Sequence, residues 1–226
     1  MELDEEHWLT CSDPAAMLRL LLRSPWLSDR KARLFAVACC HRIWSLLSDE
    51  KSRKAVEVAE RFAEGLANSE DMEGAATDAS PAYPGVSVRD YAGQVAGWVA
   101  CASDSTLAAE DAADWSARAV ASQHVERTPL WLASFNGEQA AQAELLRCIF
   151  GNPLGLWIPS LDPERNPTAL ALATGIYDER AFERMPILAD ALEEAGCTDG
   201  VILEHCRGPG PHVRGCWVVD LVLGKQ

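Results

Sequence analysis

The sequence predicts an all-α protein, a compact bundle of about eight to ten helices. Apolar residues recur three and four positions apart along most of the 226-residue chain, which is the spacing of one face of an α-helix. No segment alternates polar and apolar residues between turns, as the strands of a hairpin do. With 48% apolar and 24% charged residues, the chain has the composition of a globular protein that buries a core.

The first helices have clear start signals. Asp13 followed by Pro14 predicts a helix start, because Asp caps free backbone N–H groups and Pro suits the first helical position. Ser28 and Asp49 predict the starts of the second and third helices in the same way. The second helix is apolar on nearly all sides between residues 34 and 47, which predicts that it lies at the centre of the core.

The rest of the chain is expected to be helical after an acidic segment and a loop over residues 68–86. Residues 124–136 interrupt the helical pattern, and a proline-rich connector is expected over 151–167. The helices expected beyond residue 67 span 87–99, 104–123, 137–150, 168–177, 179–184, 186–195, 199–206 and 212–223. We expect a single all-α domain over 1–226, with sub-units at 1–67, 68–136 and 137–226.

The charge of the chain limits its partners. It has 20 Lys and Arg against 34 Asp and Glu, a formal net charge of −14. Such a chain repels the phosphates of nucleic acids and anionic membranes, so we expect neither as a partner. A protein partner of basic character fits this charge. The basic run Arg30, Lys31 and Arg33 has acidic neighbours and is interpreted as a salt-bridged helix surface.

The expected location is the cytoplasm. No run approaches the roughly 18 apolar residues that span a bilayer, and the N-terminus is acidic, unlike a secretory signal. The eight cysteines are then expected to be reduced thiols.

Cysteines and histidines near the C-terminus form a candidate zinc site, because thiolates and imidazoles are the preferred ligands of zinc. His212 and Cys216 lie four residues apart and would share one face of the expected last helix. The other candidate ligands are Cys197, His205 and Cys206. No CxxC pair accompanies them, and the alternative interpretation makes Cys206 and Cys216 buried small hydrophobes.

No catalytic residue is assigned. The chain lacks the glycine-rich loops, the nucleophile elbow and the metalloprotease motif, and no cofactor other than zinc is indicated. A third possibility is a thiol-dependent enzyme in which Cys216 pairs with His205 or His212. Cys39 and Cys40 precede His41, but adjacent residues of a helix point about 100° apart, so this group is interpreted as core. The leading hypothesis is a non-enzymatic protein-interaction or regulatory module.

Three segments resemble a large uncharacterised family of bacterial all-α proteins with many paralogues. They are SDRKARLFAVACCHRIW at 28–44, LRCIFGNP at 146–153 and GPGPHVRGCWVVDL at 208–221. The similarity extends over most of the chain and is weakest over about 68–135. The resemblance implies an interaction or accessory module and no particular reaction.

Overall fold

The structure is a computed structural model that describes residues 5–22, 24–79, 104–155 and 166–225. All regular elements in these ranges are helical, so the all-α fold class is confirmed. The helices are α1 (Glu5–Thr10), α2 (Pro14–Leu21), α3 (Asp29–Arg42), α4 (Glu50–Ala63), α5 (Ser69–Ala79), α7 (Ser105–Ala121), α8 (Pro129–Phe150), α9 (Pro167–Glu179), the 3₁₀ helix η2 (Phe182–Arg184), α10 (Met185–Glu194), α11 (Gly200–Arg207) and α12 (Trp217–Leu223). The helix expected over 87–99 lies outside the described residues.

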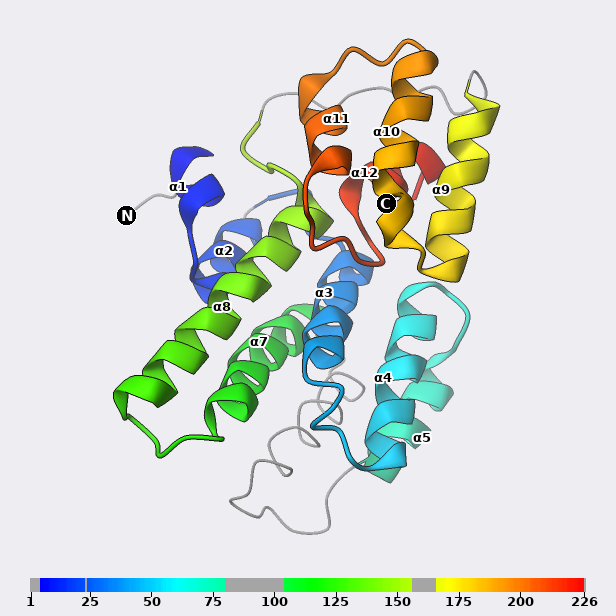
Figure 1. Ribbon diagram of the computed structural model, residues 1–226. Coiled ribbons are helices and arrows are strands. Elements are labelled where there is room, and N and C mark those ends of the chain that lie inside the picture. Colours follow the sequence, from blue (N-terminus) through cyan, green and yellow to red (C-terminus); the bar gives the residue numbers. More distant parts are fainter. Residues whose placement is uncertain (1–4, 23, 80–103, 156–165, 226) are drawn as a thin grey trace.

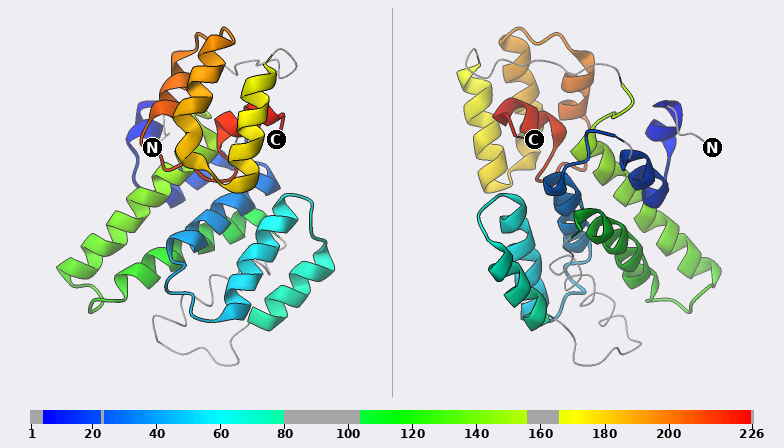
Figure 2. Two further views of the ribbon diagram at one scale, coloured as in Figure 1. Left: turned by 45° about the vertical axis from the view of Figure 1, so that its right-hand side comes forward. Right: turned by 180° about the vertical axis from the view of Figure 1, so that it is seen from behind.

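Helix α3 runs through the middle of the molecule. It packs against α4 on one side and against α7 and α8 on the other, as the views from two sides show (Figures 1 and 2). Helices α9 to α12 gather at one end, where α12 contacts both α9 and α8. None of the described helices is both long and apolar enough to cross a membrane.

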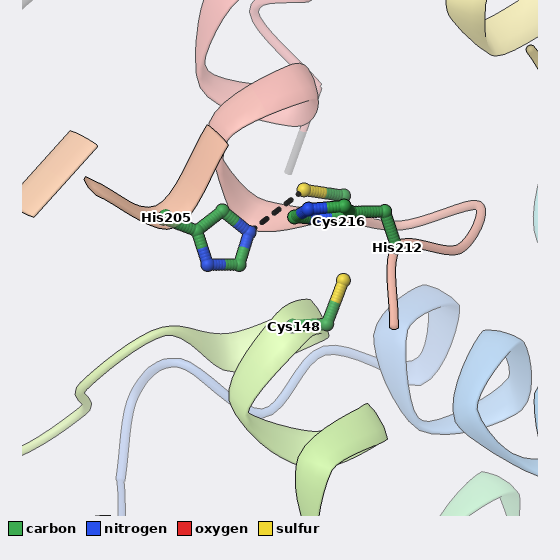
Figure 3. Close-up of side chains that lie close together, drawn as sticks. All are labelled: Cys148, His205, His212 and Cys216. Carbon is green, nitrogen blue, oxygen red and sulfur yellow. Dashed lines mark hydrogen bonds between the residues drawn. The ribbon is translucent and has the colours of Figure 1, made fainter. Parts of the chain in front are cut away.

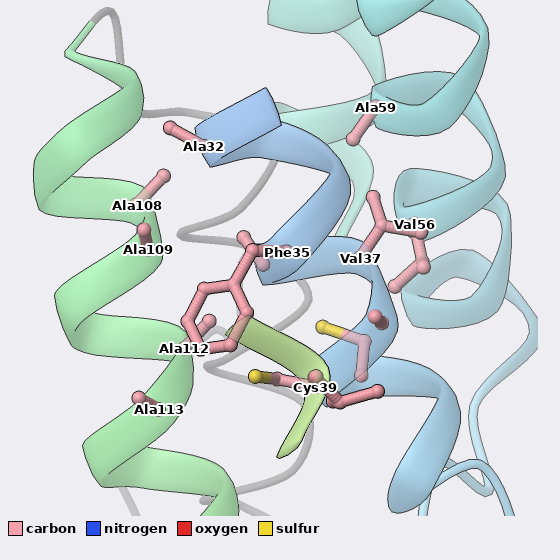
Figure 4. Close-up of a cluster of buried hydrophobic side chains, with 14 of the residues drawn as sticks. Ala32, Phe35, Val37, Cys39, Val56, Ala59, Ala108, Ala109, Ala112 and Ala113 are labelled. Carbon is pink, nitrogen blue, oxygen red and sulfur yellow. The ribbon is translucent and has the colours of Figure 1, made fainter. Parts of the chain in front are cut away.

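The larger core surrounds α3, as its sequence predicted. Phe35 is fully buried and points toward the alanine-lined face of α7, while Val56 and Ala59 of α4 lie on the opposite side (Figure 4). Ala108 and Ala112 are buried on α7, and side chains this small let two helices approach closely. Burial of this surface from water is the main force that holds the N-terminal helices together.

A second core joins α9 to α12. It contains Ile176, Leu188, Ile202 and Val218. Cys148 of α8 also belongs to this core, whereas Leu145, Leu146 and Ile149 of the same helix belong to the core around α3. The last turn of α8 therefore contacts both cores.

A buried network of charges fixes the C-terminal helices onto α3. The Arg30 guanidinium donates to both Asp220 oxygens at 2.7 and 3.0 Å and to the Tyr177 hydroxyl at 2.8 Å. Glu64 accepts from Arg30 at 3.2 Å and from the Lys225 ammonium at 2.6 Å. The Arg30 side chain is salt-bridged, as expected, but it is only 15% exposed, so it does not lie on the helix surface. Its partners are Tyr177 of α9, Asp220 of α12 and Glu64 at the end of α4, rather than its acidic neighbours in the sequence.

Helix α8 begins earlier than expected, and helix α5 was not expected. Helix α8 begins at Pro129 and continues through Gly137, because the Thr128 hydroxyl caps the backbone N–H of Trp131 at 3.3 Å and Pro suits the first position. One glycine inside a helix costs only about 1 kcal/mol. The acidic segment expected after residue 68 forms helix α5. Asn68 and Asp71 start this helix: the side chain of each accepts a hydrogen bond from the backbone N–H of the other, both 2.9 Å long, as in a capping box.

The last helix begins later than expected. Helix α12 starts at Trp217, and residues 212–216 form a turn closed by the bond from the Cys216 N–H to the Val213 carbonyl at 2.9 Å. Gly215 has a φ of +89°, which a right-handed helix cannot contain. The expected helix over 179–184 is reduced to the 3₁₀ turn η2, and the short helix α1 had no clear sequence signal.

Candidate metal centre

Four side chains from three separate segments converge at the junction of α8, α11 and α12. They are Cys148 at the end of α8, His205 of α11, and His212 and Cys216 of the turn before α12 (Figure 3). One ligand atom from each lies within 4.8 Å of all the others. Both cysteines are buried and both histidines are half-buried. These four residues could hold a metal ion.

Local sequence positions each of these segments. Asp199 starts α11, the helix that carries His205, by accepting hydrogen bonds from the N–H groups of Val201 and Ile202 at 2.7 and 3.2 Å. Gly215 precedes Cys216 in a left-handed conformation, and a Cβ at this position would lie 2.9 Å from the Leu34 Cδ1 atom. Only glycine fits there, so it brings the turn against α3 and directs Cys216 toward α8.

The structure brings together three of the five ligands that the sequence suggested: His205, His212 and Cys216. Cys206 is not among the four converging residues and is fully buried in the C-terminal core, because consecutive residues of a helix point about 100° apart. Cys197 lies between α10 and α11 and packs partly buried against the same core. His212 and Cys216 approach each other through the turn rather than along one helix face.

Cys148 was missed by the sequence analysis. It lies 57 residues before His205 in the chain, without a neighbouring cysteine or histidine at metal-ligand spacing. Its position on the apolar face of α8 is that of an ordinary buried cysteine. The one feature of the sequence that singled out Cys148 is its place within LRCIFGNP, one of the three segments that resemble the bacterial family.

The electrostatics of the cluster favour a thiolate at Cys216. The His205 Nε2 atom lies 3.2 Å from the Cys216 Sγ atom. Burial opposes ionisation of Cys216, but the Cys148 thiol and the His205 and His212 rings outweigh it and lower the pKa of Cys216 well below its ordinary value. Burial, and then the adjoining Cys216 sulfur, raise the pKa of Cys148. A thiolate is the form in which cysteine binds metals.

His212 supplies an independent indication. Both ring nitrogens are buried and have no hydrogen-bond partner, and buried polar atoms in this state are uncommon. The ring lies edge-on to His205, with ring centroids 4.9 Å apart. A cation between the two rings and the two sulfurs would give one of these nitrogens a ligand.

The residues fit zinc in type and in number. Zn–S bonds of about 2.3 Å and Zn–N bonds of about 2.0–2.1 Å in a tetrahedron separate neighbouring ligand atoms by about 3.3–3.8 Å. The four atoms, within 4.8 Å of one another, would contract by about 1.5 Å at most to reach this geometry, which side-chain rotations can supply.

Cys216 also has two features of a thiol nucleophile, a lowered pKa and an adjacent imidazole. Its side chain is fully buried, however, and a nucleophile must meet its substrate. The Cys39 and Cys40 thiols are fully buried in the larger core, and burial raises the pKa of both, so they lack this reactivity.

Comparisons with the models of protein families, with curated proteins and with solved structures found no match to this chain. The family resemblance of the three segments therefore stays a prediction.

Proposed function

We propose that this protein binds one zinc ion through Cys148, His205, His212 and Cys216, and that the ion is structural. One observation carries the proposal: four side chains of the types that zinc prefers converge within 4.8 Å. The buried, unpartnered nitrogens of His212 support it.

The number of ligands argues for a structural rather than a catalytic ion. Four protein ligands complete a tetrahedron, whereas catalytic zinc keeps one position for water or substrate. The ion would connect α8 to α11 and to the turn before α12, and so would tie the two cores together. Because it binds only the folded chain, zinc at about 100 times its Kd adds about 2.7 kcal/mol to the free energy of unfolding.

Native mass spectrometry of the zinc-loaded protein, with and without a chelator, tests the proposal. We expect one zinc per chain in the wild type, none in Cys216→Ala, and one in Cys197→Ala, the matched control outside the cluster. The melting temperature should fall with chelator in the wild type and in the control, but not in Cys216→Ala. A wild type without zinc, or a Cys216→Ala variant that retains it, contradicts the proposal.

Binding of a protein partner is the second candidate function. The turn between α7 and α8 and the start of α8 expose three large apolar side chains: Val125 at 77%, Leu130 at 65% and Leu132 at 46%. Contiguous exposed apolar surface often marks a contact site, and the net charge of −14 favours a basic partner.

A double substitution tests this second function. Cross-linking of the purified protein in extract should capture a basic protein with the wild type and lose it with Leu130→Asp/Leu132→Asp. Ile187→Asp changes an equally exposed residue of α10 (54%) and should retain it. Equal capture by all three proteins contradicts the proposed surface.

A further inference from the structure

A cavity of about 200 Å³ lies where α3 and α4 meet the C-terminal helices. One wall is apolar and includes Leu34, Val37 and Phe182. The other wall is charged and includes Glu60, Arg180 and Arg214. Pockets that bind small molecules combine an apolar lining with a few converging polar groups in this way.

The charged wall carries more positive than negative charge. Glu60 is buried, with a side chain 5% exposed, and pairs with Arg180 and, at 3.6 Å, with Arg214. Two guanidiniums therefore meet one carboxylate. Burial lowers the pKa of His41, whose ring also lines the cavity and stays neutral at pH 7. In a chain with net charge −14, this is a local excess of positive charge.

The two arginines are held differently. Arg214 is fixed: its Nη2 atom donates to the Tyr177 carbonyl at 3.0 Å, and its guanidinium lies 5.0 Å from the Tyr177 ring centroid. Arg180 ends α9 with a φ of +56°, a conformation that residues other than glycine seldom adopt. Its side chain is 44% exposed, and its Nη1 atom lies 3.5 Å from the His41 ring. Arg180 can therefore meet a ligand while Arg214 still neutralises Glu60.

We propose that this cavity binds a small carboxylic acid with an apolar body, its carboxylate on Arg180 and its body against Leu34, Val37 and Phe182. Guanidinium groups bind carboxylates through two parallel hydrogen bonds. A volume of about 200 Å³ suits a small acid of about the size of benzoate. The proposal goes beyond zinc binding: the proposed zinc ligand His212 also lines the cavity, but the contacts proposed for the acid are made by Arg180 and the apolar side chains and do not require the ion.

Isothermal titration of the full chain with benzoate, butyrate and phenylacetate tests the proposal. We expect at least one of these acids to bind at a single site, and its neutral amide to bind at least about tenfold more weakly, the usual consequence of losing charge-assisted hydrogen bonds. Arg180→Gln should weaken binding of the acid by at least about tenfold, and Arg180→Lys by less. Arg207→Gln, whose ion pairs with Asp190 and Glu193 lie outside the cavity, should bind as the wild type does.

Three results would overturn the proposal. The first is that none of the three acids binds at a concentration of about 10 mM, which is about ten times a Kd of 1 mM and would reveal even a weak site. The second is equal affinity for an acid and its amide, or for Arg180→Gln and Arg207→Gln. The third is tighter binding of inorganic phosphate than of every acid, which would remove the role of the apolar wall. Circular dichroism of each variant checks that it is folded.

Discussion

Substitution of Gly215 by alanine should strongly destabilise the protein. The new Cβ would lie 2.9 Å from the Leu34 Cδ1 atom and 3.4 Å from the Leu34 Cβ atom, and Leu34 is only 1% exposed. Overpacking of a core costs about 1–3 kcal/mol, and the positive φ of +89° adds about 1–2 kcal/mol for a residue with a Cβ. Alanine also lowers the conformational entropy of the unfolded chain, which offsets about 0.4–1 kcal/mol of this loss of stability. The net loss should be about 3 kcal/mol.

Gly137→Ala is the matched control. Gly137 lies inside α8, its φ is not positive, and a Cβ there would have no atom within 4 Å. The substitution should therefore stabilise the protein by up to about 1 kcal/mol, because alanine is the better helix former. Urea unfolding of both variants and the wild type measures the two effects. A Gly215→Ala variant within roughly 0.5 kcal/mol of the wild type would refute the close packing of this turn on α3.

Three further substitutions test other parts of the fold. Burial lowers the pKa of His41 in the folded protein, so the unfolded chain takes up the proton first, and stability falls as the pH drops below the unfolded value of about 6.5. The urea midpoint of His41→Gln should consequently decline less between pH 7 and pH 5 than that of the wild type, and parallel declines would contradict the assignment. Trp8→Phe removes the hydrogen bond from the indole N–H to the Gly151 carbonyl at 2.8 Å. It should lower the free energy of unfolding by about 1–3 kcal/mol, measured by thermal unfolding. An unchanged melting temperature would show that this bond does not hold α1 to α8. Glu138→Gln removes a carboxylate that is 5% exposed and lies 2.5 Å from Arg42. It should lower the free energy of unfolding by only about 1–2 kcal/mol, because water can still solvate the Arg42 charge that is left without its partner. A urea curve that overlays that of the wild type would contradict this prediction.

Several helices were predictable because their signals are local. Asp13, Ser28 and Asp49 each accept hydrogen bonds from backbone N–H groups two or three residues later, as their types and positions predicted. The apolar stretch of α3 predicted its central place, since a helix that is apolar on all sides must be buried. The start of α8 was harder to predict, because the sequence offers two starting points. Gly137 suggested a start at that residue, whereas the helix begins at Pro129 behind the Thr128 cap.

The candidate site was predictable only in part. His205, His212 and Cys216 lie within 12 residues of one another, so a short stretch of sequence suggested that they could meet. The choice between His205 and Cys206 depended on which face of α11 packs into the C-terminal core, and that face carries Ile202, Leu203 and Cys206. The turn before α12, rather than a helix, brings His212 and Cys216 to the same place.

The sequence by itself determined the all-α class, the central position of α3 and the kind of ligand available near the C-terminus, because composition, helical periodicity and capping act over a few residues. Only the tertiary structure placed Cys148 beside His205 and buried Arg30 against Asp220, partners 57 and 190 residues apart. The physical reason is that such contacts depend on how whole helices pack, and a helix's own sequence specifies which face is buried but not which residue of another helix will meet it.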